Sequence, residues 1–346
     1  MIYLIDPTTD KYGHHEVYLN TLLNITDTKA LQMKVDIRRI KLNIINIVKY
    51  YKALHVQLHA IPKGNLAHIL YSDIYYKIPF LSSSLLQRNK TIVTMHSCPN
   101  GKIKRWLMKN FCKRVSAVIV HSEFIKEKLN KLGLTNVYYI DYPSFYDYSS
   151  LAPRKELRKQ AGLTGNDIVL TALGGIRHDK GLDILLEAFK YLDKTEKQRI
   201  VLNIAGREGF MNSHQIAELC HTNGIRSRLN IQPLTDKEFM ENVEISDYLV
   251  MPYRCKMTGN SGPMTEAIVR NIPSVVPKGS NLGYIAEHYH VGVTFQQENV
   301  MDLAKTITSL VKNPFKISGK YSHKLTQSTF IQKHIELYTL IINQHN

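Results

Sequence analysis

Short apolar runs alternate with amphipathic stretches along the whole chain. Runs bounded by polar or glycine-containing turns predict buried strands, and stretches with apolar residues at helical spacing predict helices between them. The predicted strands are residues 2–5, 54–58, 91–95, 117–120 and 137–140 in the first half, and residues 168–173, 201–204, 248–251, 274–276 and 291–295 in the second. This alternation predicts an α/β fold with two doubly wound, Rossmann-like parallel-sheet domains facing across a cleft.

The domain boundary is predicted where the periodicity lapses. Pro, Ser and Tyr cluster between residues 142 and 153, and 346 residues exceed the usual size of a single core. We therefore expect an N-terminal domain over residues 1–150 and a C-terminal domain over residues 151–320. The terminal segment 321–346 contains a helical pattern, and we expect this helix to pack back across the domain junction.

One predicted strand-to-helix junction has the features of an anion site. The apolar run ends in Gly174 and Gly175, Arg177 and Lys180 follow, and Gly181 precedes an amphipathic helix. Glycines let the backbone approach a ligand, and the N–H groups and dipole of a helix N-terminus favour negative charge. The pattern favours a bound diphosphate. The alternative is a plain tight turn with two solvated cations, since neither G-x-G-x-x-G nor a P-loop motif is present.

A second polar loop follows residues 248–251. The backbone amides of Asn260, Ser261 and Gly262 precede a predicted helix and are expected to face a second phosphate edge. Glu266 lies one turn into that helix. A carboxylate that accepts two hydroxyl hydrogen bonds suits a ribose diol, whereas the alternative is a carboxylate that only interacts with the helix dipole.

Polar residues also follow predicted strands of the first half. In doubly wound folds, ligands bind at the carboxyl ends of the strands. Gly13 lies at the start of a helix after the first strand, and His96 ends a central strand facing the predicted cleft. We predict that both belong to the site, whereas His121, after the next strand, fits a structural role better.

Composition narrows the class of protein. With 44% hydrophobic and 21% charged residues the chain is globular, and no run approaches the ~20 apolar residues of a membrane span. Asp6 interrupts the apolar start too early for a signal peptide, so we expect a cytoplasmic protein. Four cysteines without a C-x-x-C pair predict reduced thiols rather than a disulfide framework or a zinc site.

The positive charge is unevenly distributed. The formal net charge is +16, of which residues 1–150 carry +11, and this predicts an anionic partner. Its strongest expression is residues 102–115. The apolar positions there, at helical spacing, are Ile103, Trp106, Leu107, Phe111 and Val115, and the cations are Lys102, Lys104, Arg105, Lys109, Lys113 and Arg114.

This basic segment has two interpretations. The first is a helix lying at an anionic membrane surface, or recognising an anionic acceptor, because each cation near an anionic leaflet contributes on the order of 1 kcal/mol. The second is an ordinary surface helix whose apolar side, with Trp106, packs into its own domain. Nucleic-acid binding is disfavoured, because no RNP motif, zinc finger or arginine-rich tract accompanies the charge.

Taken together, the motifs of the second half resemble the donor-binding domain of GT-B glycosyltransferases. The resemblance is to the family-four-like retaining enzymes (glycosyl transferases group 1) of cell-surface polysaccharide biosynthesis. GGIRHDKGLDILLEAF is similar to their G-x-(x)-R-x-x-K-G-x-x-x-L-x-x-A-F segment, LNIAGREG to the strand-G-x-G turn, DYLVMPY to the a-D-x-x-v-x-P-[SY] strand, and SGPMTEAIVRNIPSVV to the E-A-x-x-x-G-x-P-V-V stretch. GHHEVYLNTLL, TIVTMHS and VSAVIVHSEFIKEKL match the first half more loosely.

The resemblance implies roles for the predicted site. Arg177 and Lys180 would grip the donor diphosphate, and Glu266 would bind the ribose. His96 would face the transferred sugar, and Gly13 would lie under the phosphates. The implied reaction moves a sugar from a nucleotide diphosphate donor to a hydroxyl of a lipid-linked or glycan acceptor. It would proceed with retention, without a metal or cofactor, at the inner face of the membrane.

Two positions depart from the family pattern. The paired glutamates of the family are spaced E-x7-E, but Thr258 stands eight positions before Glu266, where the family's Glu contacts the donor sugar. Arg270 and Asn271 stand where the family favours Gly. Thr258 leaves open a non-catalytic module that binds nucleotide sugars or polysaccharide. A basic nucleic-acid-binding protein would explain the charge but not the four ordered motifs.

Overall fold

The computed structural model describes residues 1–6, 14–32, 44–77 and 83–344. The chain forms two units: unit 1 comprises Met1–Phe145 and Lys324–Asn346, and unit 2 comprises Tyr146–His323. The sequence placed these boundaries at residues 150 and 320. The C-terminal segment, treated as a separate element in the sequence analysis, is part of unit 1.

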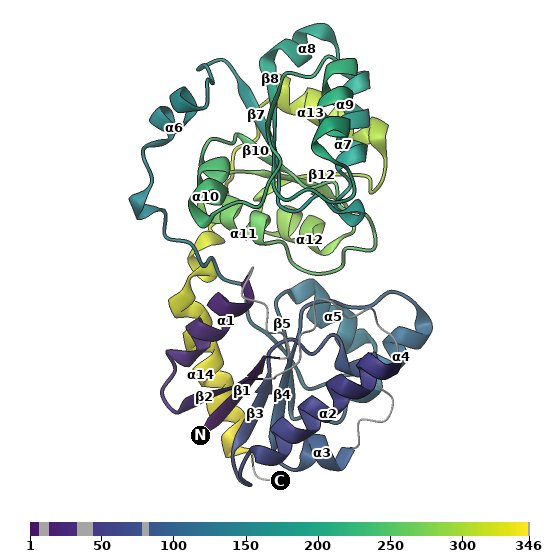
Figure 1. Cartoon of the computed structure of the whole chain (residues 1–346), viewed down its shortest axis with the longest axis vertical. Coiled ribbons are helices and arrows are strands. Elements are labelled where there is room, and N and C mark those ends of the chain that lie inside the picture. Colours follow the sequence, from purple (N-terminus) through teal and green to yellow (C-terminus); the bar gives the residue numbers. More distant parts are fainter. Residues whose placement is uncertain (7–13, 33–43, 78–82, 345–346) are drawn as a thin grey trace. The chain divides into compact units, whose positions relative to one another are not determined.

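Unit 1 is built on a six-stranded parallel sheet with strand order β2-β1-β3-β4-β5-β6 (Figure 1). Its strands are β1 (Ile2–Asp6), β2 (Thr28–Gln32), β3 (Leu66–Ile69), β4 (Lys90–Met95), β5 (Ala117–Val120) and β6 (Val137–Tyr139). Its helices are α1 (His14–Leu23), α2 (Ile44–Ala60), α3 (Ser83–Gln87), α4 (Lys102–Cys112), α5 (Glu123–Lys131) and α14 (Gln327–Asn343).

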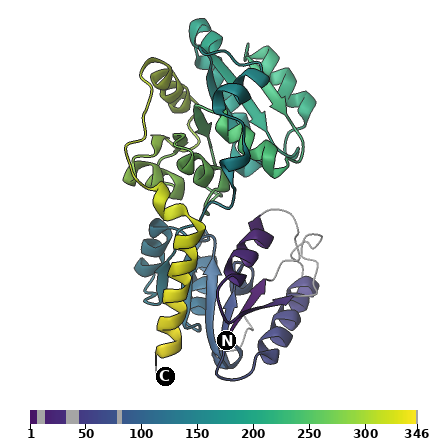
Figure 2. The ribbon, with the colours of Figure 1, turned by 90° about the vertical axis from the view of Figure 1, so that its left-hand side faces the viewer.

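Helices cover both faces of this sheet, because alternate strand residues point to opposite sides. Leu4 and Ile92 lie in a core with α1 and α14, whereas Ile5 and Val93 lie in a core with α2, α3, α4 and α5. Figures 1 and 2 show α14 running along the sheet beside α1. Phe330 is one of the buried residues that α14 contributes to that core. The last helix of the chain is therefore an integral layer of unit 1.

Unit 2 has a second six-stranded parallel sheet, with strand order β12-β11-β10-β7-β8-β9. Its strands are β7 (Ile168–Leu173), β8 (Ile200–Ala205), β9 (Ser227–Asn230), β10 (Tyr248–Val250), β11 (Ser274–Pro277) and β12 (Gly292–Phe295). Its helices are α6 (Arg154–Gln160), α7 (Leu182–Ala188), α8 (Lys194–Arg199), α9 (Ser213–Thr222), α10 (Asp236–Glu244), α11 (Gly262–Val269), α12 (Asn281–His288) and α13 (Val300–Lys312). The order reverses at β7 and β10, which is where doubly wound sheets bind ligands.

The α/β class and both parallel sheets are as predicted, but one predicted strand is wrong. Residues 54–58 lie within α2, where Tyr50, Leu54 and Leu58 are buried and Val56 is 62% exposed. This four-residue spacing of buried side chains is that of a helix, not a strand. The strands β2, β3 and β9 were not predicted from the sequence.

Candidate functional site

The predicted glycine turn follows β7 and requires glycine at two positions. Gly174 has φ +104° and Gly206, after the neighbouring strand β8, has φ +144°, backbone conformations that favour glycine. A Cβ on Gly206 would lie 2.2 Å from the carbonyl oxygen of Gly174, so the two loops touch backbone to backbone. Hydrogen bonds from Gly174 N to Ala205 O (2.8 Å) and from Ile176 N to Arg207 O (2.8 Å) fix this approach.

Lys180 lies over this turn. A Cβ on Gly174 would be 2.7 Å from Nζ of Lys180, and the same Nζ is 5.6 Å from the centre of the Tyr253 ring. Lys180 ends a 3-10 turn (His178–Lys180), and Gly181, with φ +67°, then caps α7. Gly174, Lys180 and Tyr253 are among the residues that line a small pocket. The structure therefore brings a cation to the glycine turn that the sequence predicted.

Arg177 is held differently. Its guanidinium donates two hydrogen bonds to the carboxylate of Asp179, and its side chain is 59% exposed. The Arg177 hydrogen bonds hold the pKa of the Asp179 carboxyl below its usual value. Arg177 thus lies near the turn with its charge already paired, whereas no ion pair of Lys180 occurs among the described residues.

Arg254, which the sequence analysis did not single out, joins the two predicted donor loops. It donates bidentate hydrogen bonds to Asp183 of α7 (2.9 and 2.6 Å) and a third to the carbonyl of His178 (2.6 Å), while its backbone N–H donates to the carbonyl of Asp179 (2.9 Å). Burial alone would raise the pKa of Asp183, but the hydrogen bonds and charge of Arg254 outweigh it and hold that pKa below its usual value. We call Arg254 and Asp183 the loop clamp.

The second loop leads into α11. Ser261 precedes the helix, Gly262 is its first residue, and proline follows at a position that tolerates it. Asn260 accepts a 2.5 Å hydrogen bond from Asn281 of α12, and the Ser261 hydroxyl lies 3.2 Å from the Tyr253 hydroxyl. Thr258 is half-buried in the same loop. These residues are gathered at the N-terminus of α11, and their contact with a donor stays a prediction.

Glu266 is only 1% exposed and accepts a hydrogen bond from a residue near the start of unit 2. The Tyr148 hydroxyl, from a 3-10 turn (Tyr148–Ser150), donates a 3.2 Å hydrogen bond to Glu266 Oε2. Burial, and then the charge of Glu266, raise the pKa of Tyr148, so the phenol stays protonated and able to donate. Arg270 lies 4.9 Å from the Tyr148 ring centre. Sequence spacing gave no signal for Tyr148, which lies 118 residues before its partner.

His96 follows β4 in unit 1, at the carboxyl edge of that sheet. Its Nε2 is 2.9 Å from the carbonyl oxygen of Leu70, so Nε2 carries the proton and Nδ1 is the acceptor nitrogen. Burial lowers the pKa of His96, although the Asp73 carboxylate opposes the effect. Asp73 accepts hydrogen bonds from the backbone N–H groups of His96 and Ser97, both 2.9 Å. His96 is therefore a neutral imidazole held in one orientation.

Aromatic rings flank His96. Tyr71 stacks on it with ring centres 4.2 Å apart, and His15 stacks on Tyr71 with ring centres 3.6 Å apart. His121 is 2% exposed and bonds the carbonyl of Ile140 (2.8 Å), which agrees with the structural role expected for it. Gly13 lies outside the described residues.

The helix α4 covers most of the predicted basic segment, and its apolar residues do not form one buried side. Phe111 is buried, whereas Ile103 and Trp106 are 76% and 63% exposed. The interpretation in which Trp106 packs into its own domain is therefore wrong. Lys102, Lys104 and Arg105 surround the two exposed apolar residues and are themselves exposed, and Lys113 is exposed beyond the other end of the helix. Lys109 differs, because its Nζ lies against the turn at Gly133.

No group of three or more His, Cys, Asp or Glu side chains in the described part of the chain is arranged to hold a metal ion. No described helix combines the length and apolarity needed to cross a membrane.

Two doubly wound parallel sheets, one in each unit, are the architecture of GT-B glycosyltransferases. Residues 153–330 match the family model for glycosyl transferases group 1. Because this is half of the chain, the chain belongs to that family and is a glycosyltransferase. A comparison with curated protein sequences finds no match.

Solved structures share the whole fold at low sequence identity. Sucrose-phosphate synthase from Thermosynechococcus elongatus superimposes with a TM-score of 0.75 at 14% identity, over 98% of both chains. HepE from Anabaena, in complex with UDP, gives 0.70 at 14% identity over 98% of this chain and 99% of its own. A glycosyltransferase from Rickettsia africae gives 0.67 at 14% identity over 99% of both chains.

Proposed function

We propose that this chain transfers a sugar from a nucleotide diphosphate donor to an acceptor hydroxyl, with retention and without a metal ion. The observation that carries the proposal is Lys180 Nζ poised over the Gly174 turn, whose backbone φ of +104° favours glycine. Negative charge develops on the leaving diphosphate as the glycosidic bond breaks, and a fixed ammonium beside backbone N–H groups stabilises that charge most where it grows. HepE, which shares the fold, has been crystallised with UDP-glucose, which supports a donor of this class.

Arg177 adds a second cation in this mechanism. Its pair with Asp179 is exposed, and such pairs contribute only about 0–1 kcal/mol. A diphosphate with two charges can therefore draw the guanidinium away from Asp179. The departing phosphate takes the proton of the acceptor hydroxyl, so that no covalent enzyme nucleophile is needed. His96, neutral and with Nδ1 as acceptor, can receive a hydrogen bond from a hydroxyl group of a ligand at the carboxyl edge of the unit 1 sheet.

Release of nucleoside diphosphate from a panel of UDP, GDP, ADP and CMP sugars tests this proposal. Lys180→Ala should lower kcat by 100-fold or more, since loss of one transition-state donor costs about 3–4 kcal/mol. The matched control is Lys190→Ala, an exposed lysine of unit 2 that pairs with Glu187 away from the turn. The proposal would be refuted if the wild-type protein bound and turned over no donor, or if kcat fell equally in both variants.

The acceptor side of the proposal rests on α4. We propose that the exposed Ile103 and Trp106, with Lys102, Lys104 and Arg105 around them, lie at an anionic membrane surface and bring the enzyme to a lipid-linked acceptor. Exposed apolar side chains ringed by cations are typical of interfacial helices.

Co-sedimentation with phosphatidylglycerol vesicles tests the membrane proposal. Trp106→Ser should weaken vesicle binding several-fold, because Trp burial at the interface is lost. The control is Tyr191→Ser, which removes an exposed aromatic side chain from unit 2. Unchanged vesicle binding of Trp106→Ser would count against the membrane role of α4. It would not bear on the proposed transfer reaction.

A further inference from the structure

A second pocket lies at the amino edge of the unit 1 sheet, and it shares only Lys113, Arg114 and Val115, the end of the basic segment, with the residues discussed above. It is formed by the turns that precede β3, β4 and β5, three neighbouring strands. Its volume is about 440 Å³, within the ~300–1,000 Å³ of small-molecule sites. The strand β4 runs from Lys90 at this edge to Met95 beside His96, a distance of about 17 Å at ~3.3 Å per residue. The pocket is therefore separate from the carboxyl edge.

The charged residues that line this pocket are all basic: Arg88, Lys90, Lys113 and Arg114. Lys90 already donates to the carbonyls of Ile342 (2.9 Å) and Gln344 (2.5 Å) at the end of α14. Arg88 and Lys113 form no ion pair among the described residues. Surfaces normally intersperse both signs of charge, and a concave site with cations alone concentrates anions.

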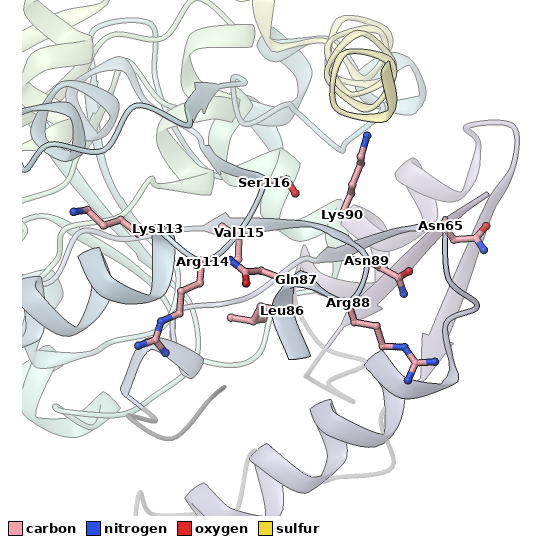
Figure 3. A pocket seen from close by; sticks show the side chains of 11 residues that line it. Asn65, Leu86, Gln87, Arg88, Asn89, Lys90, Lys113, Arg114, Val115 and Ser116 are labelled. Atoms are coloured by element: carbon pink, nitrogen blue, oxygen red, sulfur yellow. The ribbon is translucent and has the colours of Figure 1, made fainter. Parts of the chain in front are cut away.

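Two buried polar atoms at the pocket have no hydrogen-bond partner among the described residues. Within the described part of the chain, neither Nε of Arg88 nor Oδ1 of Asn89 has a hydrogen-bond partner. Asn89 is only 7% exposed, and its amide nitrogen donates to the carbonyl of Ile61 (3.3 Å), which sets the side-chain orientation. Buried groups of this kind are normally satisfied, so each one needs an explanation. Figure 3 shows Gln87 between Arg114 on one side and Arg88 on the other, with Lys90 turned toward α14.

The chemistry of the lining specifies the ligand. Unpaired guanidinium and ammonium groups bind phosphate oxygens, and a buried acceptor such as Asn89 Oδ1 requires a donor such as a hydroxyl. We propose that this pocket is a second binding site, for a phosphate ester that carries free hydroxyl groups. A soluble sugar phosphate or glycerol phosphate has this chemistry, and so does the phosphoglycerol headgroup of an anionic lipid. The proposal goes beyond the transfer reaction and does not depend on it.

Titration calorimetry of the full chain with glycerol phosphate at ~0.15 M salt, a concentration that screens non-specific attraction, tests the soluble source. Arg88→Gln and Lys113→Gln should each raise the dissociation constant at least fivefold. Lys131→Gln, an exposed lysine at the end of α5, should not change it. Lys113 is exposed, so its variant keeps the test decisive should Arg88→Gln fold poorly. Lys180→Ala should bind glycerol phosphate like the wild type, which separates this site from the donor site.

Vesicles distinguish the lipid source. Binding to phosphatidylglycerol vesicles that is lost in Arg88→Gln and Lys113→Gln but kept in Lys131→Gln, without binding of soluble glycerol phosphate, would assign the site to the headgroup. Loss of soluble binding in the same two variants would assign it to a free phosphate ester. Absence of both kinds of binding in the wild type, or equal losses in Lys131→Gln, would overturn the proposal.

Discussion

The loop clamp is expected to set donor affinity. Arg254 is 15% exposed and Asp183 35% exposed at their side chains, and their two hydrogen bonds tie the loop after β10 to the turn that carries Lys180. Hydrogen bonds to charged groups contribute about 1.5–3 kcal/mol when buried, and partial exposure reduces this. We therefore expect a coupling free energy of about 1–2 kcal/mol between Arg254 and Asp183. Without the clamp, donor binding has to order the two loops, and this cost weakens binding. Arg254→Ala should therefore raise the donor KM about tenfold, because 1.4 kcal/mol corresponds to a factor of ten.

The assay is a double-mutant cycle on the donor that the panel identifies. Arg254→Ala, Asp183→Ala and the double variant are compared for donor KM, kcat and unfolding midpoint. Arg254→Lys should recover part of the affinity, since an ammonium keeps the charge but not the bidentate geometry. The matched control is Arg226→Ala, which breaks the Arg226–Asp167 ion pair of unit 2 and should lower stability without changing donor KM.

Two outcomes would refute this reasoning. One is a coupling energy below about 0.5 kcal/mol, within the error of additivity. The other is a donor KM that changes equally in Arg254→Ala and Arg226→Ala, which would reduce the clamp to an ordinary stabilising contact.

Two further predictions address the turn and the unit 1 core. Gly206→Ala places a Cβ 2.2 Å from the carbonyl oxygen of Gly174, so it should lower the free energy of unfolding by at least about 2 kcal/mol and abolish turnover. The control is Gly165→Ala, whose Cβ meets nothing within 4 Å and which should have neither effect. A thermal melt and a rate assay measure the two effects. Burial lowers the pKa of His334 from 6.5 to about 4, so the unfolded chain binds the extra proton between these values. The contribution of His334 to stability is therefore complete above pH 6.5, falls as the pH drops and amounts to a loss of about 2 kcal/mol by pH 5. Hydrogen exchange of the unit 1 strands, measured at pH 7 and pH 5, should show that this loss of stability is smaller in His334→Gln than in the wild type. An equal loss in both proteins would contradict the lowered pKa of His334.

The fold was predictable where burial leaves a periodic trace in the sequence. Most central strands of the two sheets appear as apolar runs, as in residues 168–173, because helices cover both of their faces. The buried central strand β3, LAHI, was missed because it is only four residues long and contains His68. The edge strands β2 and β9 were missed because their sequences, TKALQ and SRLN, contain few apolar residues. The run at residues 54–58 misled because short apolar runs fit a buried helix as well as a strand.

The site was predictable where the residues that form it are close in sequence. Gly174 and Lys180 are six positions apart, and their contact follows from one strand-turn-helix unit. Arg254 contacts Asp183 across 71 positions and Tyr148 contacts Glu266 across 118, so their partners are decided by the sheet order rather than by local pattern. Closeness in sequence also misled at Arg177. The motif assigned this cation to the donor, but in the structure it forms an ion pair with Asp179, two positions away.

The membership of α14 in unit 1 has a consequence for synthesis on the ribosome. The strands of unit 1 emerge first, but one face of their sheet is covered by α1 alone until α14 has been translated, after all of Tyr146–His323. At ~5–20 residues per second this delay is roughly 10–40 s. During that time the core that contains Leu4 and Ile92 lacks one of its two helices. A nascent chain stalled before residue 324 should therefore expose apolar surface that chaperones bind, even with unit 2 already folded.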